Sequence, residues 1–117
     1  MRRIFVFTLF LMICAAAFGG YERVIISELQ TAKTLAGVVT DTNDEALPDV
    51  LVVEVSPDGK TTIRSTTTDS EGRWSLPPTG RRIYHLLFVK NGFNDIQVRV
   101  KLSKVGKKLR FSLPVAT

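Results

Sequence analysis

With 117 residues the chain has room for one domain, and its formal net charge of +5 is small and scattered, which argues against a nucleic-acid partner. The only cysteine, Cys14, has no second thiol for a disulfide, so stability must come from an apolar core. The single histidine, His85, cannot build a catalytic zinc site, because such a site needs three protein ligands.

The first 19 residues have the composition of a secretory signal peptide. Arg2 and Arg3 form a short basic start, and an apolar run at 4–13 leads into small residues. This run is shorter than the roughly 20 residues that span a bilayer. We therefore expect residues 1–19 to be removed and the mature protein to be periplasmic or extracellular, without a stable membrane span. An uncleaved N-terminal anchor is the alternative.

Residues 20–34 are ambiguous between helix, strand and linker. Four of their side chains recur at near-helical spacing: Tyr21, Ile25, Leu29 and Ala32. The stretch 23–27 is equally suited to a short strand. The sequence therefore leaves the structure of this N-terminal segment open.

Residues 35–115 alternate short apolar or β-branched stretches with turn residues, which is typical of an all-β domain. Strands are expected at 35–41, 50–55, 60–68, 73–76, 83–90, 96–102 and 109–113. The pattern predicts a small antiparallel β-sandwich of about seven strands. The alternation also predicts the main core side chains: Val39, Trp74, Leu76, Tyr84, Leu86, Phe88 and Phe111.

The run Asp69-Ser70-Glu71 raises the question of an acidic site for a metal or for acid–base chemistry. Turn chemistry explains each residue, because an aspartate bonds its own backbone at a turn start and Gly72 tolerates a positive φ. We interpret the run as a turn between two strands.

A second acidic stretch places Asp41, Asn43 and Glu45 at alternating positions, which superficially suits calcium. The stretch lacks the central glycine and distal glutamate of an EF-hand loop. A turn is again the preferred interpretation. No catalytic, cofactor-binding or metal-binding residue is assigned, and His85 is expected to be a half-exposed strand residue.

Five short pieces in a fixed order resemble the carboxypeptidase regulatory-like domain. They are Leu35, Gly37, Val39 and Asp41; Leu47, Pro48, Val50 and Val52; Thr68, Asp69, Gly72 and Trp74; Tyr84 and Leu86; and Gly92 and Phe93. The resemblance covers Leu35 to about Leu113. It departs from the family pattern where Asp49 replaces a usual glycine and where Gly80 lies unusually far from Tyr84.

This resemblance implies a transthyretin-like or prealbumin-like sandwich, also described as a carbohydrate-binding-like fold, of a kind common in exported bacterial proteins. It implies a non-catalytic accessory or structural module that acts through contact with another protein. A carbohydrate-binding module of the cell envelope or secreted fraction is the alternative. Sugar sites usually need exposed aromatic rings, and the alternation of this chain mostly buries them.

Two of the expected strands are apolar on both faces, whereas a half-buried strand should alternate. If one face of each fills the core, five apolar residues lie on outer faces: Leu51, Val53, Ile83, Leu87 and Val89. They form one interaction face if the two strands are neighbours. Alternatively, the N-terminal segment folds back and covers them with Val24, Ile25 and Leu29.

Overall fold

The structure is a computed structural model that describes residues 23–116. All regular secondary structure in this range is strand: β1 (Arg23–Asp41), β2 (Leu51–Val55), β3 (Thr62–Thr67), β4 (Arg73–Ser75), β5 (Tyr84–Val89), β6 (Asp95–Leu102) and β7 (Lys107–Leu113). The predicted all-β class with about seven strands is confirmed. The expected signal peptide, residues 1–19, lies outside the described residues.

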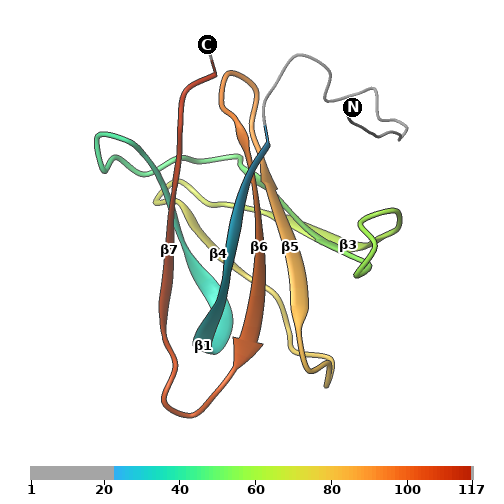
Figure 1. Ribbon diagram of the computed structural model, residues 1–117. Coiled ribbons are helices and arrows are strands. Elements are labelled where there is room, and N and C mark those ends of the chain that lie inside the picture. Colours follow the sequence, from blue (N-terminus) through green and yellow to red (C-terminus); the bar gives the residue numbers. More distant parts are fainter. Residues whose placement is uncertain (1–22, 117) are drawn as a thin grey trace.

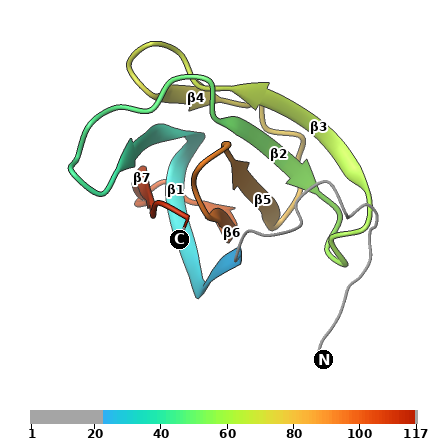
Figure 2. The ribbon, with the colours of Figure 1, turned by 90° about the horizontal axis from the view of Figure 1, so that it is seen from above.

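The strands form one continuous sheet that bends into two layers around the core. Its order is β3-β2-β5-β6-β1-β4, and β7 pairs with the remaining edge of β1. We call β3, β2, β5, β6 and the first half of β1 the large layer, and β4, the second half of β1 and β7 the small layer. Figure 1 shows β3 crossing behind β5, and Figure 2 shows β2 and β3 side by side and the sheet curling around the interior.

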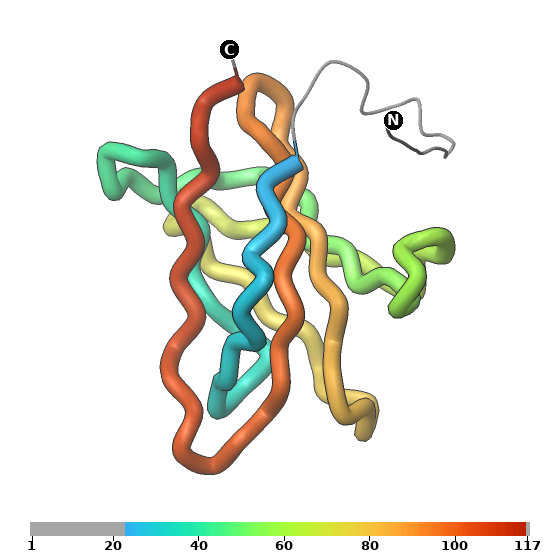
Figure 3. Tube along the Cα trace, viewed as in Figure 1, coloured from blue at the N-terminus to red at the C-terminus, as the bar shows by residue number. Residues whose placement is uncertain are grey.

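The long strand β1 joins the two layers because it reverses direction partway. Its first half runs parallel to β6, from the pair Arg23–Asp95 onward, and its second half runs parallel to β7. Figure 3 shows the chain descending beside β6 and then returning. The β6–β7 turn locks the reversal, since Ser103 N–H donates to the Ala32 carbonyl at 2.8 Å. A Cβ on Gly106 would lie 2.3 Å from the Ala32 carbonyl carbon, so this approach requires glycine.

The N-terminal segment is therefore strand, and it does not fold back over the large layer. Residues 23–32 extend that layer edge-on by pairing with β6. Val24 is 37 % exposed and Ile25 is 64 % exposed, so neither covers an apolar face. The fold-back expectation is wrong because the free edge of β6 offers this segment a ladder of backbone hydrogen bonds, which satisfies more polar groups than packing on a face would. The parallel pairing of β1 was also not foreseen.

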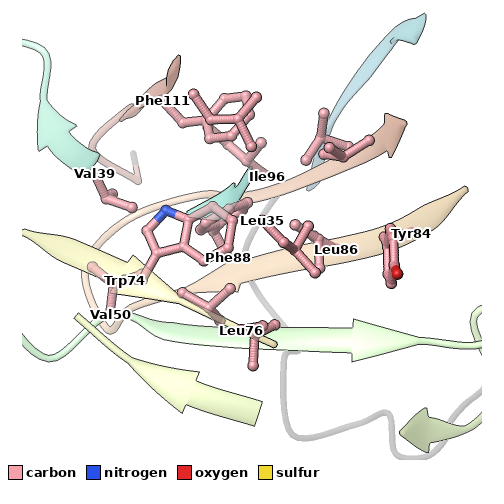
Figure 4. Packing of buried hydrophobic residues seen from close by; sticks show 14 of the residues in the cluster. Leu35, Val39, Val50, Trp74, Leu76, Tyr84, Leu86, Phe88, Ile96 and Phe111 are labelled. Carbon is pink, nitrogen blue, oxygen red and sulfur yellow. The ribbon is translucent and has the colours of Figure 1, made fainter. Parts of the chain in front are cut away.

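The core between the layers contains the side chains that the alternation predicted. All seven expected core residues are buried, with Val39, Leu86 and Phe88 at 0 % exposure. Figure 4 shows Trp74 packed among side chains from both layers. The Trp74 and Phe88 rings meet edge to face with centroids 5.4 Å apart. Such pairs add to the free energy gained by burying each ring.

The departure at Asp49 has a backbone explanation. Asp49 has φ of 61°, which lies in the left-handed region where glycine is the usual residue. Aspartate is one of the few other residues that visit this region routinely. Asp49 therefore takes a conformation at the entry to β2 that is more often found at glycine.

Candidate functional site

The apolar residues singled out in the sequence lie on the outer face of the large layer. Leu51 and Val53 of β2 stand opposite Val89 and Leu87 of β5 in antiparallel register. The two strands are thus neighbours, as the predicted interaction face required. Val53, Val55 and Leu87 pack with the partly buried Val89 into a small cluster separate from the core, which we call the outer-face cluster.

Four of the five expected residues, Leu51, Val53, Leu87 and Val89, share this side of the sheet, and Ile83 directly precedes β5. Leu51 is 36 % exposed, whereas Val53 and Leu87 are each only 7 % exposed. Ile83 and Val89 are partly exposed. Side chains of the cluster pack against one another. Val53 and Leu87 at its centre therefore have less solvent-exposed surface than isolated apolar side chains on a sheet would have. The accessible apolar surface is therefore at the rim of the cluster.

A shallow depression of about 300 Å³ adjoins the cluster on the same face. Its lining includes Ile25, Pro57, His85, Gln97 and Arg99. Gln97 stands between Leu87 and Ile25 in one cross-strand row, so the apolar cluster and the polar depression are continuous. Arg99 is held in place because its Nη2 donates to the Ser27 carbonyl at 2.6 Å. His85 is half exposed here, as the sequence predicted.

One residue on this face was missed by the sequence analysis. Asp95 begins β6 and is only 2 % exposed, and its Oδ1 has no hydrogen-bond partner. Burial raises the pKa of the Asp95 carboxyl to about 6, against the opposing charge of Arg23. The closest nitrogen of Arg23 lies 4.0 Å from Asp95 Oδ2, too far for a hydrogen bond. The only signal in the sequence is a single acid directly before the strand expected at 96–102.

A second buried acid lies on the opposite, inward face of β2. Glu54 is 1 % exposed, and its Oε1 accepts from Arg64 Nε at 2.6 Å. Arg81 Nε approaches Glu54 Oε2 at 3.4 Å. The loop that carries Arg81 is fixed because Thr79 N–H donates to the Tyr84 hydroxyl at 2.9 Å. A buried carboxylate requires such paired cations, so this group is accounted for by the fold.

The acidic run at Asp69 is a turn, as interpreted from the sequence. Asp69 Oδ1 accepts the N–H groups of Glu71 and Arg73, each at 2.9 Å, and Gly72 has φ of 75°. The Arg73 N–H is the main group that holds the pKa of the Asp69 carboxyl below its usual value. The carboxylate oxygens are thus engaged by the chain itself.

The stretch at Asp41 forms the same kind of turn. Asp41 Oδ1 accepts the N–H groups of Asn43 and Glu45 at 2.8 and 3.0 Å. Asp44 occupies the same position in this turn as Gly72 in the other turn, and it too has a positive φ, of 67°. The likeness of the two turns is not visible in the sequence, because an aspartate stands in place of the glycine that marks the turn at Asp69.

No group of three or more His, Cys, Asp or Glu side chains within residues 23–116 is arranged to hold a metal ion. Over the same range, no helix has the length and apolarity needed to cross a membrane.

The comparisons with known proteins bear on these observations. A search of curated proteins returned no match. The family model described as the carboxypeptidase regulatory-like domain matches residues 34–114, well over half of the chain. That range begins within β1 and ends just after β7, so it includes the small layer, the outer-face cluster and the large layer apart from the first half of β1. The chain therefore belongs to the carboxypeptidase regulatory-like domain family.

Proposed function

We propose that this chain is a non-catalytic accessory module that acts through contact with another protein, and that the contact is made by the outer face of the large layer. The observation that carries the proposal is the outer-face cluster. Membership of a regulatory-like family supports a role in which the domain serves a partner rather than a substrate.

Strands β2 and β5 have the composition of strands that are covered on both faces. Val52 and Leu86 face the core, while Val53 and Leu87 face the other way. Near-continuous apolar runs are usual where both faces of a sheet are packed, and alternation is usual where one face meets water. Among the described residues, the outer-face cluster contains side chains of β2 and β5 alone. A partner surface that packs on the cluster would supply the second cover.

The surroundings of the cluster favour a partner with both apolar and acidic groups. Leu51 and Ile25 offer exposed apolar side chains at two sides of the face. Arg23 and Arg99 add exposed positive charge, while Asp95, the neighbour of Arg23 in the β1–β6 ladder, is buried. Interfaces commonly combine an apolar centre with a polar rim whose charges complement the partner.

Export to the periplasm or the extracellular space is part of the proposal. It rests on the basic start, the apolar run and the small residues of residues 1–19. N-terminal sequencing of the purified protein should find a start between Phe18 and Tyr21. A mature chain that retains Met1 would contradict export with cleavage.

The carbohydrate-binding alternative finds no support in the described residues. Trp74, Tyr84, Phe88 and Phe111 are all buried, and Phe93 packs partly buried against the core. A sugar platform needs an exposed ring face, and residues 23–116 present none. Retention of the protein on an insoluble glycan would nevertheless favour this alternative.

Site-specific photo-cross-linking in the producing cell tests the contact. A photoreactive residue at position 97, beside Leu87, should give a discrete cross-linked band, and Leu87→Lys in the same chain should abolish it. The matched control is the same photoreactive residue at the exposed Lys108 of β7, in the small layer, which should give no such band. Equal cross-linking at both positions, or a band that survives Leu87→Lys, contradicts the proposal.

A further inference from the structure

Lysines that are far apart in the sequence meet at one end of the fold, where β1 reverses and β6 turns into β7. Ala32 of β1 pairs with both Leu102 of β6 and Lys107 of β7, so the two bends lie together, as Figures 1 and 3 show. Neither 101–108 nor 29–36 contains an acidic residue. We call this region the basic end, and it has five exposed lysines: Lys33, Lys101, Lys104, Lys107 and Lys108.

The positive charge of the basic end is not neutralised within the described domain. None of the five lysine side chains forms an ion pair or a hydrogen bond with another part of residues 23–116. Exposed arginines elsewhere do have acidic partners. Arg73 pairs with Asp69 and Glu71, and Arg110 pairs with Asp44. The lysines are therefore free to meet an anionic surface.

The two acidic turns lie at the opposite end of the small layer. Val39 N–H donates to the Gly72 carbonyl of one turn, and the Val39 carbonyl accepts Leu47 N–H beside the other. The second half of β1 runs from near Leu35 at the basic end to Asp41, which is about 20 Å of extended strand. Charges that far apart are largely screened at physiological salt, where the Debye length is about 8 Å. The acidic turns therefore do little to cancel the field of the basic end.

An apolar side chain projects from the middle of the basic end. Val105, in the β6–β7 turn, is 90 % exposed. The turn holds it outward, because Gly106 N–H donates to the Ser103 carbonyl at 3.0 Å and Ser103 N–H donates to the Ala32 carbonyl. One exposed valine is ordinary on a protein surface. An exposed valine directly after Lys104, among unpaired lysines, is the combination that suits a membrane surface.

We propose that the basic end docks the domain on a bilayer that contains anionic phospholipids, with the lysine amines at the headgroup phosphates and Val105 inserted at the acyl boundary. Each lysine near such a surface strengthens binding by about fivefold. A nucleic acid would attract the same lysines, but its phosphate backbone has no apolar layer for Val105. The docking is peripheral and needs no membrane-spanning segment.

Co-sedimentation of the purified protein with lipid vesicles tests the docking. The protein should bind vesicles of phosphatidylcholine mixed with phosphatidylglycerol and should bind phosphatidylcholine alone much less. Lys104→Glu should weaken binding to the mixed vesicles at least about tenfold, because repulsion replaces attraction. Val105→Ser should weaken it about fivefold, because the apolar insertion is lost.

The matched control is Lys60→Glu, which makes the same change of charge in the β2–β3 turn. Figure 1 shows this turn at the side of the molecule, away from the basic end, so vesicle binding should stay unchanged. Because all variants carry the same N-terminus, any contribution of residues 1–22 to vesicle binding cancels in the comparison. Leu87→Ala should also leave binding unchanged, since the outer-face cluster is a separate surface, so that the two proposals fail separately.

Three results would overturn the inference. The first is no binding to the mixed vesicles, or equal binding to both kinds. The second is equal weakening by Lys60→Glu and Lys104→Glu, which would show attraction by net charge alone. The third is a DNA duplex that binds as tightly as the mixed vesicles, together with full vesicle binding by Val105→Ser, which would indicate a general site for polyanions.

Discussion

Leu86 and Leu87 are adjacent residues of one strand that point to opposite sides of the large layer. Leu86 is 0 % exposed in the core, and Leu87 is 7 % exposed in the outer-face cluster. The two leucines therefore look alike by exposure alone. They differ in what surrounds them, since Leu86 belongs to a cluster of seventeen buried residues and Leu87 to one of three.

Burial of side chains in the core is needed for folding, whereas we expect the domain to fold without the buried contacts of the outer-face cluster. The inner face packs against the small layer, and the core cluster draws side chains from β1, β2, β4, β5, β6 and β7. The outer-face cluster draws its members from β2 and β5 alone. Removing a core side chain leaves a cavity in a rigid setting, whereas water and neighbouring side chains can fill a gap on an open face.

The largest effect is expected for Trp74→Ala, at the centre of the inner face. The indole packs edge to face on Phe88 and is 4 % exposed. Loss of a buried tryptophan usually costs about 3–5 kcal/mol of unfolding free energy, enough to unfold a small domain. Urea denaturation followed by circular dichroism measures this loss. A red-shifted tryptophan emission from the folded unaltered protein would contradict the buried assignment.

The two leucines form a matched pair for the next test. Leu86→Ala should lower the free energy of unfolding by about 2–5 kcal/mol, the usual range for a core leucine. Leu87→Ala should lower it by only about 1–2 kcal/mol. The substitution loses the free energy of removing the leucine side chain from water, but it leaves no enclosed cavity. Equal losses in the same urea experiment would show that the outer face is as essential to the fold as the inner one.

Asp95 gives the outer face a pH dependence in the acidic range. Its pKa is about 6 in the folded chain against 3.8 ordinarily, so the folded state binds the proton more tightly. Its stabilising contribution is present below about pH 4 and is lost as pH rises through 6. The two-unit difference corresponds to roughly 3 kcal/mol at most.

Urea denaturation at several pH values between 4 and 7 measures this contribution. Asp95→Asn cannot ionise and should remove the fall in stability over that interval, which makes the variant the more stable protein at pH 7. The comparison with the unaltered chain cancels other groups that titrate in the same window. Parallel pH profiles for both proteins would show that Asp95 is not the group responsible.

Much of the fold could be predicted from the sequence, because period-two alternation and turn residues are local signals. The alternation around Trp74 identified the core, and Gly72 identified its turn. The path of β1 could not be predicted, since residues 23–34 become a strand only by pairing with β6, far along the chain. Their spacing suited a helix equally well.

The position of the candidate site could be predicted from the sequence, but the exposure of its side chains could not. Successive side chains of a strand point to opposite faces. In a strand that is apolar at every position, half of the apolar side chains must therefore point outward, and this placed Leu51, Val53 and Leu87 on the outer face. The sequence could not show that Val53 and Leu87 shield each other, because that depends on cross-strand register. Asp95 was missed for the same reason, since its surroundings include Arg23 of β1, which is far away in the sequence.

The central claim is that the outer-face cluster is not needed to hold the isolated domain together and is therefore free to serve a contact. The unfolding free energy of Leu87→Lys tests it most directly, with Leu86→Lys as the matched variant. A lysine at position 87 can extend its amine past the cluster into water, so a cooperative unfolding transition should remain. Leu86→Lys would bury the charge in the core and should abolish that transition. If Leu87→Lys is unfolded as well, the outer face belongs to the fold and the claim is wrong.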